Sequence, residues 1–173
     1  MQVLRIFHCL SPVLLLAGGL LSQCGCGQSS TPLGPGALAP PLTAPGWLNG
    51  KAPAEADLAG KVVVVELWAY WCGYCPANAQ ELIKLEKEYR GQDVVFVAFT
   101  PDGNESKLSS QEWLQAQGVP WPSGYGATEV INQLRAPGFP MTYVIGRDNR
   151  VVWHSLVPGD IHAAIDTALA RQP

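Results

Sequence analysis

The continuous run of hydrophobic residues from 61 to 67, KVVVVEL, constrains the fold of this chain most. It is rich in β-branched valine and shows no alternation of apolar and polar residues, which is typical of a central strand buried on both faces of a sheet. A second such run covers residues 93–99, and a helical pattern covers residues 77–89 between them. Two buried strands joined by a helix predict a right-handed parallel βαβ unit.

Weaker patterns extend this unit in both directions. We expect a helix over 106–117, two strands over 142–146 and 151–154 joined as a hairpin, and a last helix that Asp160 caps and that ends at Ala170. The Asn49-Gly50 turn predicts a small hairpin over residues 47–51. Together these elements predict an α/β fold with a mixed central sheet and helices on both faces.

Composition limits what the chain can be. Its 173 residues, 47% of them hydrophobic, can build one domain with a substantial core plus an N-terminal extension. A net charge of −3 leaves no basic surface of the kind that binds nucleic acid, so we expect no nucleic-acid partner.

The first 24 residues have the layout of an export signal. Arg5 precedes a mostly apolar stretch that ends at Leu21, and the uninterrupted part is too short to span a bilayer. Leu21-Ser22-Gln23-Cys24 resembles the box that precedes a lipidated cysteine in bacterial lipoproteins. We therefore expect lipidation at Cys24 and a Pro/Gly/Ser-rich linker over 25–46 that tethers a domain spanning 47–173. A cleaved soluble form and an uncleaved anchor remain open.

Two cysteines, Cys72 and Cys75, stand apart from the three N-terminal ones. We expect no metal site, because no second cysteine pair or histidine pair at zinc-ligand spacing accompanies them. A disulfide between such close neighbours would constrain the unfolded chain little, so redox chemistry explains the pair better than stability does. Cys72, expected at the start of the helix after the buried strand, would be the attacking thiolate, and Cys75 would resolve the mixed disulfide.

Glu66 is the one carboxylate within the first buried strand. A buried acid needs a partner or a use, since burial of an unpaired charge is costly. The alternative is that its side chain reaches solvent at the edge of the sheet.

These motifs together resemble one family. WAYWCGYC, the preceding GKVVVVELWA and the later GFPMT (138–142) are similar to the thioredoxin-fold thiol–disulfide oxidoreductases, in particular the membrane-tethered TlpA/ResA group of bacterial envelopes. The resemblance implies an extra helical insertion over 105–134 between the two halves of the fold. It also implies a cis-proline at Pro140 beside the active-site disulfide, and places Glu66 near the second cysteine as a proton acceptor.

The same resemblance suggests which residues meet a substrate. Trp71, Gly73, Tyr74 and Phe139 would contact it, and Trp68 would pack beneath the site. Asn78 stands where some ResA-type proteins have a glutamate, which leaves open whether apocytochrome c is the substrate.

The function expected on these grounds is a membrane-tethered oxidoreductase on the periplasmic side of the bacterial envelope. It would exchange the Cys72–Cys75 dithiol and disulfide with protein substrates, as a reductant, and receive electrons from a redox partner of the envelope. We expect a monomer without cofactor. The alternatives are a peroxiredoxin-like peroxidase, although no Pro-x-x-x-Thr-x-x-Cys arrangement surrounds Cys72, and a non-catalytic interaction module.

Overall fold

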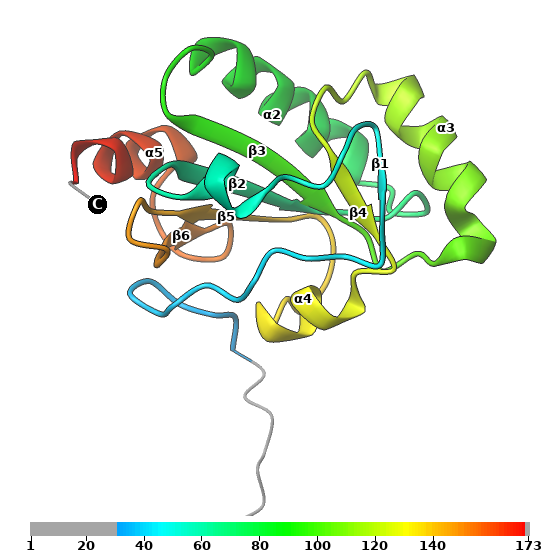
Figure 1. The fold of residues 1–173 in the computed structure, drawn as a ribbon, viewed down its shortest axis with the longest axis horizontal. Helices are drawn as coiled ribbons and strands as arrows, with labels where there is room; N and C mark the ends of the chain where they lie inside the picture. The colour runs from blue at the N-terminus through cyan, green and yellow to red at the C-terminus, as the bar shows by residue number, and fades with distance from the viewer. Residues whose placement is uncertain (1–30, 172–173) are drawn as a thin grey trace, which may run out of the picture.

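The architecture is a six-stranded mixed sheet with helices on both faces, in a computed structural model that describes residues 31–171 (Figure 1). The strands follow the order β1-β4-β3-β2-β5-β6 across the sheet. Their bounds are β1 (Gly46–Leu48), β2 (Val62–Leu67), β3 (Val94–Phe99), β4 (Ser123–Tyr125), β5 (Met141–Ile145) and β6 (Val151–His154). The predicted α/β class with a mixed sheet is confirmed.

Helices cover the two faces unequally. The bounds are α1 (Glu55–Leu58), α2 (Cys75–Glu88), a 3₁₀ turn η1 (Asn104–Ser106), α3 (Lys107–Gln117), α4 (Thr128–Gln133) and α5 (Ile161–Ala170). Figure 1 shows α2 and α5 on one side of the sheet and α4 on the other. The predicted cap of α5 is confirmed, because Asp160 Oδ1 accepts a hydrogen bond from the Ala163 N–H at 2.9 Å.

Strand β2 lies at the centre of the sheet, and this explains its composition. It pairs in parallel with β3 and antiparallel with β5, and all six of its residues are buried. Because side chains alternate along a strand, Val64, Glu66 and the following Trp68 point to one face. Val63, Val65 and Leu67 belong to the core cluster on the opposite face, which includes residues of α4. A continuous valine-rich run is what burial on both faces requires.

The expected hairpin at 47–51 is wrong. Strand β1 pairs instead with β4, in the register Trp47↔Gly124. The amide of Asn49, which follows β1, donates hydrogen bonds to the carbonyls of Val119 and Trp121. The turn therefore connects distant segments. The insertion over 105–134, which was expected to be helical, also contains the strand β4.

The described part of the expected linker is docked on the domain. The N–H of Leu33 donates to the carbonyl of Leu134 at 2.9 Å, and the N–H of Ala39 donates to that of Asn149 at 2.8 Å. Ala39 is buried, and Leu42 packs against the core on the α4 side. Residues 33–44 of the expected linker are thus packed on the domain. Residues 1–30, with the expected signal and Cys24, lie outside the described residues.

Candidate active site

The two cysteines form a disulfide at the start of α2. Cys72 and Cys75 are joined with a Cα–Cα separation of 5.4 Å. Helix α2 begins at Cys75, three residues later than the expected start at Cys72. The N–H of Cys75 donates to the carbonyl of Cys72, and Pro76 follows in the first helical turn. Proline is tolerated there because it lacks an N–H that would otherwise need a partner.

The two sulfur-bearing residues differ in exposure. Cys72 is 7% exposed, whereas Cys75 is fully buried in the core cluster on the α2 face. The residue after Cys72, Gly73, is exposed and has open space where a Cβ would stand. Access from solvent to the pair is therefore from the Cys72 side.

Aromatic side chains surround this exposed side. Trp71 is 59% exposed and Tyr74 is 82% exposed. Phe139 packs against the core cluster that contains both cysteines. Its ring lies edge-on to the ring of Trp71, with 5.9 Å between the two ring centroids. The Phe139–Pro140 peptide bond is cis. The structure thus brings Trp71 and Phe139 together beside the disulfide and leaves Tyr74 projecting into solvent.

Two tryptophans are held by hydrogen bonds. Trp71 Nε1 donates to Asp102 Oδ1 at 3.0 Å, and Asp102 in turn accepts from the Thr100 hydroxyl at 2.6 Å. Trp68 is fully buried and donates from Nε1 to the Ser123 hydroxyl at 2.9 Å. Sequence reasoning missed the role of Asp102, because nothing in the pattern connects it to a residue 31 positions earlier.

Glu66 is buried in the centre of the sheet, so the alternative of a solvent-facing edge position is wrong. Its carboxyl is 1% exposed, and Asn78 Nδ2 donates to Oε1 at 3.2 Å. Oε2 finds no hydrogen-bond partner among residues 31–171. Burial raises the pKa of Glu66 from 4.5 to about 7, against the opposing influence of the Asn78 amide and the Trp121 indole.

Glu66 also shares a face of the sheet with the second cysteine. Its strand neighbours Val64 and Trp68 belong to the same core cluster as Cys75. Asn78, which binds the carboxyl, lies one helical turn after Cys75 on α2. The carboxyl and the buried sulfur therefore belong to one enclosed region.

Sequence reasoning treated Asn78 only as a departure from the family pattern. In the structure it joins Glu66 to Thr142, whose hydroxyl donates to Asn78 Oδ1 at 3.5 Å. A signal was available, since a polar residue one turn after a buried cysteine on a core-facing helix needs a buried partner.

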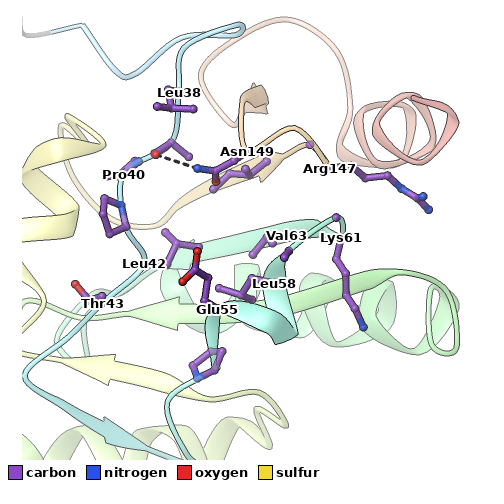
Figure 2. Close-up of a pocket in the computed structure, with 17 residues that line it drawn as sticks. Leu38, Pro40, Leu42, Thr43, Glu55, Leu58, Lys61, Val63, Arg147 and Asn149 are labelled. Atoms are coloured by element: carbon purple, nitrogen blue, oxygen red, sulfur yellow. Dashed lines mark hydrogen bonds between the residues drawn. The ribbon is translucent and has the colours of Figure 1, made fainter. Parts of the chain in front are cut away.

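One cavity lies away from this site. It has a volume of about 690 Å³ and lies between residues 38–43, α1 and the turn between β5 and β6. Figure 2 shows Leu42, Leu58 and Val63 within it and Lys61 and Arg147 toward one end. None of the predicted site residues lines it.

Two negative findings concern the described residues alone. Between residues 31 and 171, no group of three or more His, Cys, Asp or Glu side chains is arranged to hold a metal. No helix in this range has the length and apolar character needed to cross a membrane.

The sequence is similar to a known protein family and to proteins named thiol-disulfide oxidoreductase. The sequence model of the AhpC/TSA family matches residues 35–154. The thiol-disulfide oxidoreductase ResA of Bacillus subtilis is 28% identical over 105 residues, which are 60% of this chain and 58% of ResA. Protein FixW of Rhizobium leguminosarum is 37% identical over 62 residues, which are 36% of this chain and 28% of FixW. The chain thus spans less than two thirds of the length of these relatives.

A solved structure shows the fold. The thiol:disulfide interchange protein of the thioredoxin family from Chlorobium tepidum superposes with a TM-score of 0.65 at 23% sequence identity. The match covers 79% of this chain and 98% of that one. The thioredoxin-like fold expected from the sequence is confirmed.

Proposed function

The chain belongs to the AhpC/TSA family, and from this premise we propose that it is a thiol–disulfide oxidoreductase that exchanges the Cys72–Cys75 dithiol and disulfide with protein substrates. One observation carries the proposal. The pair stands at a helix start, with Cys72 the more exposed cysteine, at 7%, next to the exposed Trp71, and with Cys75 fully buried on the sheet face that also carries the buried carboxyl of Glu66. The relatives named thiol-disulfide oxidoreductase support it.

The reaction proceeds in two exchanges, here in the reducing direction. The Cys72 thiolate attacks one sulfur of a substrate disulfide, that S–S bond breaks, and one substrate thiolate leaves and takes a proton from water. Glu66 then accepts the proton of Cys75, whose thiolate attacks the Cys72 sulfur. The mixed disulfide breaks, the second substrate thiolate leaves, and two electrons have passed from the pair to the substrate.

The residues around the pair have separate roles in this proposal. Trp71, Tyr74 and Phe139 provide an apolar surface for an extended substrate segment. Gly73 leaves space for that segment beside Cys72, and Pro140 presents no N–H of its own.

Reduction of insulin disulfides by dithiothreitol, followed as turbidity, tests the activity. The wild-type protein should accelerate precipitation, and Cys72→Ser should abolish the acceleration. A wild-type protein without effect on insulin, or on any disulfide-bonded protein tried in its place, would leave the chain a non-catalytic interaction module.

A peroxidase is the second candidate, and the family match is the observation that favours testing it. Peroxide reduction requires one cysteine thiolate to attack an oxygen of the peroxide, with loss of water and formation of a sulfenic acid. Consumption of hydrogen peroxide by the reduced wild-type protein, compared with Cys72→Ser, decides between the two activities.

We further propose that the protein works as a reductant, exported to the periplasmic side of the bacterial envelope and held at the membrane by a lipid on Cys24. The reduction potential of the Cys72–Cys75 couple, equilibrated against glutathione, tests the direction of electron flow. Mass spectrometry of the N-terminus of the native protein tests the anchor. A free N-terminus beyond Cys26 would exclude the lipid.

A further inference from the structure

We infer that Asn78 is a positioning residue for the resolving step. Its side chain orients the Glu66 carboxylate and separates it from a groove between α2 and α5, and water in that groove takes up the proton that Glu66 removes from Cys75. The inference rests on the proposed function.

The contacts of Asn78 fix its amide on both sides. Nδ2 donates to Glu66 Oε1 at 3.2 Å, and Oδ1 accepts from Thr142 Oγ1 at 3.5 Å. Since an ionised carboxylate can only accept hydrogen bonds, the NH₂ group must face Glu66. Thr142 is itself the cross-strand neighbour of Glu66 on β5 and is 3% exposed. The three side chains therefore form one buried polar line across the interface of α2 with the sheet.

This line ends at a groove of about 410 Å³. Asn78 and Thr142 both line the groove, together with Trp153 of β6 and Ser155, which follows β6. Glu66 does not line it. The carboxyl is thus one side chain away from the groove. Asn78, Thr142 and Ser155 offer the polar partners that an ordered water needs.

The groove opens on a different part of the surface from the disulfide. No residue of the segments 70–75 and 139–140 lines it. A substrate bound over the exposed aromatic side chains during the mixed-disulfide state would cover the Cys72 side. Because Cys75 is fully buried, the proton that Glu66 accepts then needs a second way out, and the groove remains open to solvent.

No charged side chain packs directly against the Glu66 carboxyl among the described residues. Uncharged side chains face it from every packed element: Asn78 from α2, Trp121 from the loop before β4, Ala98 from β3 and Thr142 from β5. The ionisable groups of the groove are Glu81, Lys84 and Glu88 on α2 and His162 on α5. An amide does not gain or lose a proton at neutral pH, so Asn78 acts by orientation and the water carries the proton.

The first experiment needs no activity. The Glu66 carboxyl of the disulfide form is titrated by ¹³C NMR in the wild type, in Asn78→Leu and in the matched control Asn132→Leu, at an exposed position of α4. Loss of the amide donor should move the midpoint up by about one pH unit in Asn78→Leu and leave the control unchanged. Asn78→Ala replaces the leucine variant if the latter does not fold. An unchanged midpoint would overturn the positioning role.

The second experiment follows both exchanges by stopped flow with a disulfide-bonded peptide. Asn78→Leu should resolve the mixed disulfide about fivefold more slowly at pH 7, since a midpoint raised by one pH unit from about 7 lowers the ionised fraction of Glu66 from about one half to about one tenth. Ser155→Trp, which fills the groove, should slow the same step at least severalfold without changing the first attack, whereas Ser109→Trp on α3 should change neither. An unchanged resolving rate in Ser155→Trp would overturn the groove as the route. A wild-type protein that reduces no disulfide would contradict the proposed function, and the titration would still decide the role of Asn78.

Discussion

At the residue scale, Glu66 carries a carboxyl group whose burial inside a strand is energetically unfavourable. It is 1% exposed, one of its oxygens accepts from Asn78, and the other has no partner among the described residues. Such burial favours the neutral acid and raises the pKa of Glu66 to about 7. A group that changes charge near neutral pH in a closed site is suited to proton transfer, whereas a purely structural role would be served better by glutamine.

The stability of the oxidised protein should therefore depend on pH through Glu66. The pKa is higher in the folded state, about 7, than the ordinary value of 4.5, so the folded state binds more protons between these values. Stability should fall as pH rises from about 4.5 to about 7 and change no further through this group, by about 3 kcal/mol in total. Glu66→Gln should lack this dependence. Chemical denaturation of both proteins at pH 4, 6 and 8 measures it.

The comparison of the two proteins is the control for all other titrating groups. The difference in unfolding free energy, wild type minus Glu66→Gln, should become more negative from pH 4 to pH 8. A difference that is constant across this range would mean that Glu66 titrates alike in the folded and unfolded states.

The two cysteines should also differ in what they trap. Cys72 is the more exposed of the pair, and Cys75 is enclosed in the core. Cys75→Ser should accumulate mixed disulfides with protein substrates because the resolving thiol is missing, and Cys72→Ser should accumulate none. Non-reducing electrophoresis with mass spectrometry measures the adducts. Faster alkylation of Cys75 than of Cys72 in the reduced protein would reverse the assignment.

At the scale of elements, the short strand β4 depends on a glycine. Gly124 pairs with Trp47 of β1 and with Phe99 of β3. A Cβ at this position would stand 2.5 Å from the Cβ of Ala44 and 2.8 Å from the ring of Phe99. The close approach of residue 44 to the sheet is thus possible only without a side chain at 124.

Gly124→Ala should lower the unfolding free energy by about 1–3 kcal/mol, the usual cost of overpacking a core. The matched control is Gly34→Ala, where a Cβ would meet nothing within 4 Å. Thermal and chemical denaturation measure both. Equal stability of the two variants would mean that residues 44 and 124 separate without cost.

The elements that the sequence predicted well are those with long periodic patterns. Strands β2 and β3 and helices α3 and α5 begin and end within two residues of the expected bounds, and α2 does so when compared with the helical pattern over 77–89. Strand β4 has only three residues, Ser-Gly-Tyr, and its pairing depends on partners far along the chain, so no local pattern indicates it. At the site, the cysteine motif and Glu66 could be recognised. The place of Asn78 one turn after Cys75 indicated that it needs a buried partner, but its partner Thr142 could not be recognised, because their contact requires the packing of α2 on β5.

At the scale of the whole molecule, proline and glycine content suggested a linker where the structure has a docked segment. Residues 33–39 form backbone hydrogen bonds with Leu134 directly after α4, with β6 and with the turn before β6, and Arg150 Nη1 donates to the carbonyl of Gly36 at 2.8 Å. Leu33, Leu42 and Ala44 pack against the core on the α4 face. A segment with low helix and strand propensity can therefore still be part of the folded domain, because its backbone N–H and C=O groups can form hydrogen bonds with neighbouring elements.

The docked segment should contribute to stability as part of the domain. A chain that begins at Thr31 keeps the contacts of residues 33–44, whereas one that begins at Pro45 loses them and exposes apolar side chains of the core cluster against which they pack. Two leucines and several backbone hydrogen bonds together are worth at least about 3 kcal/mol. Guanidinium denaturation should thus show a lower midpoint for the chain beginning at Pro45. The cysteines lie on the opposite core cluster, so the Cys72–Cys75 reduction potential should be the same in both chains. Equal midpoints would show that the segment is a spacer after all, since its contacts would then add nothing to the folded state.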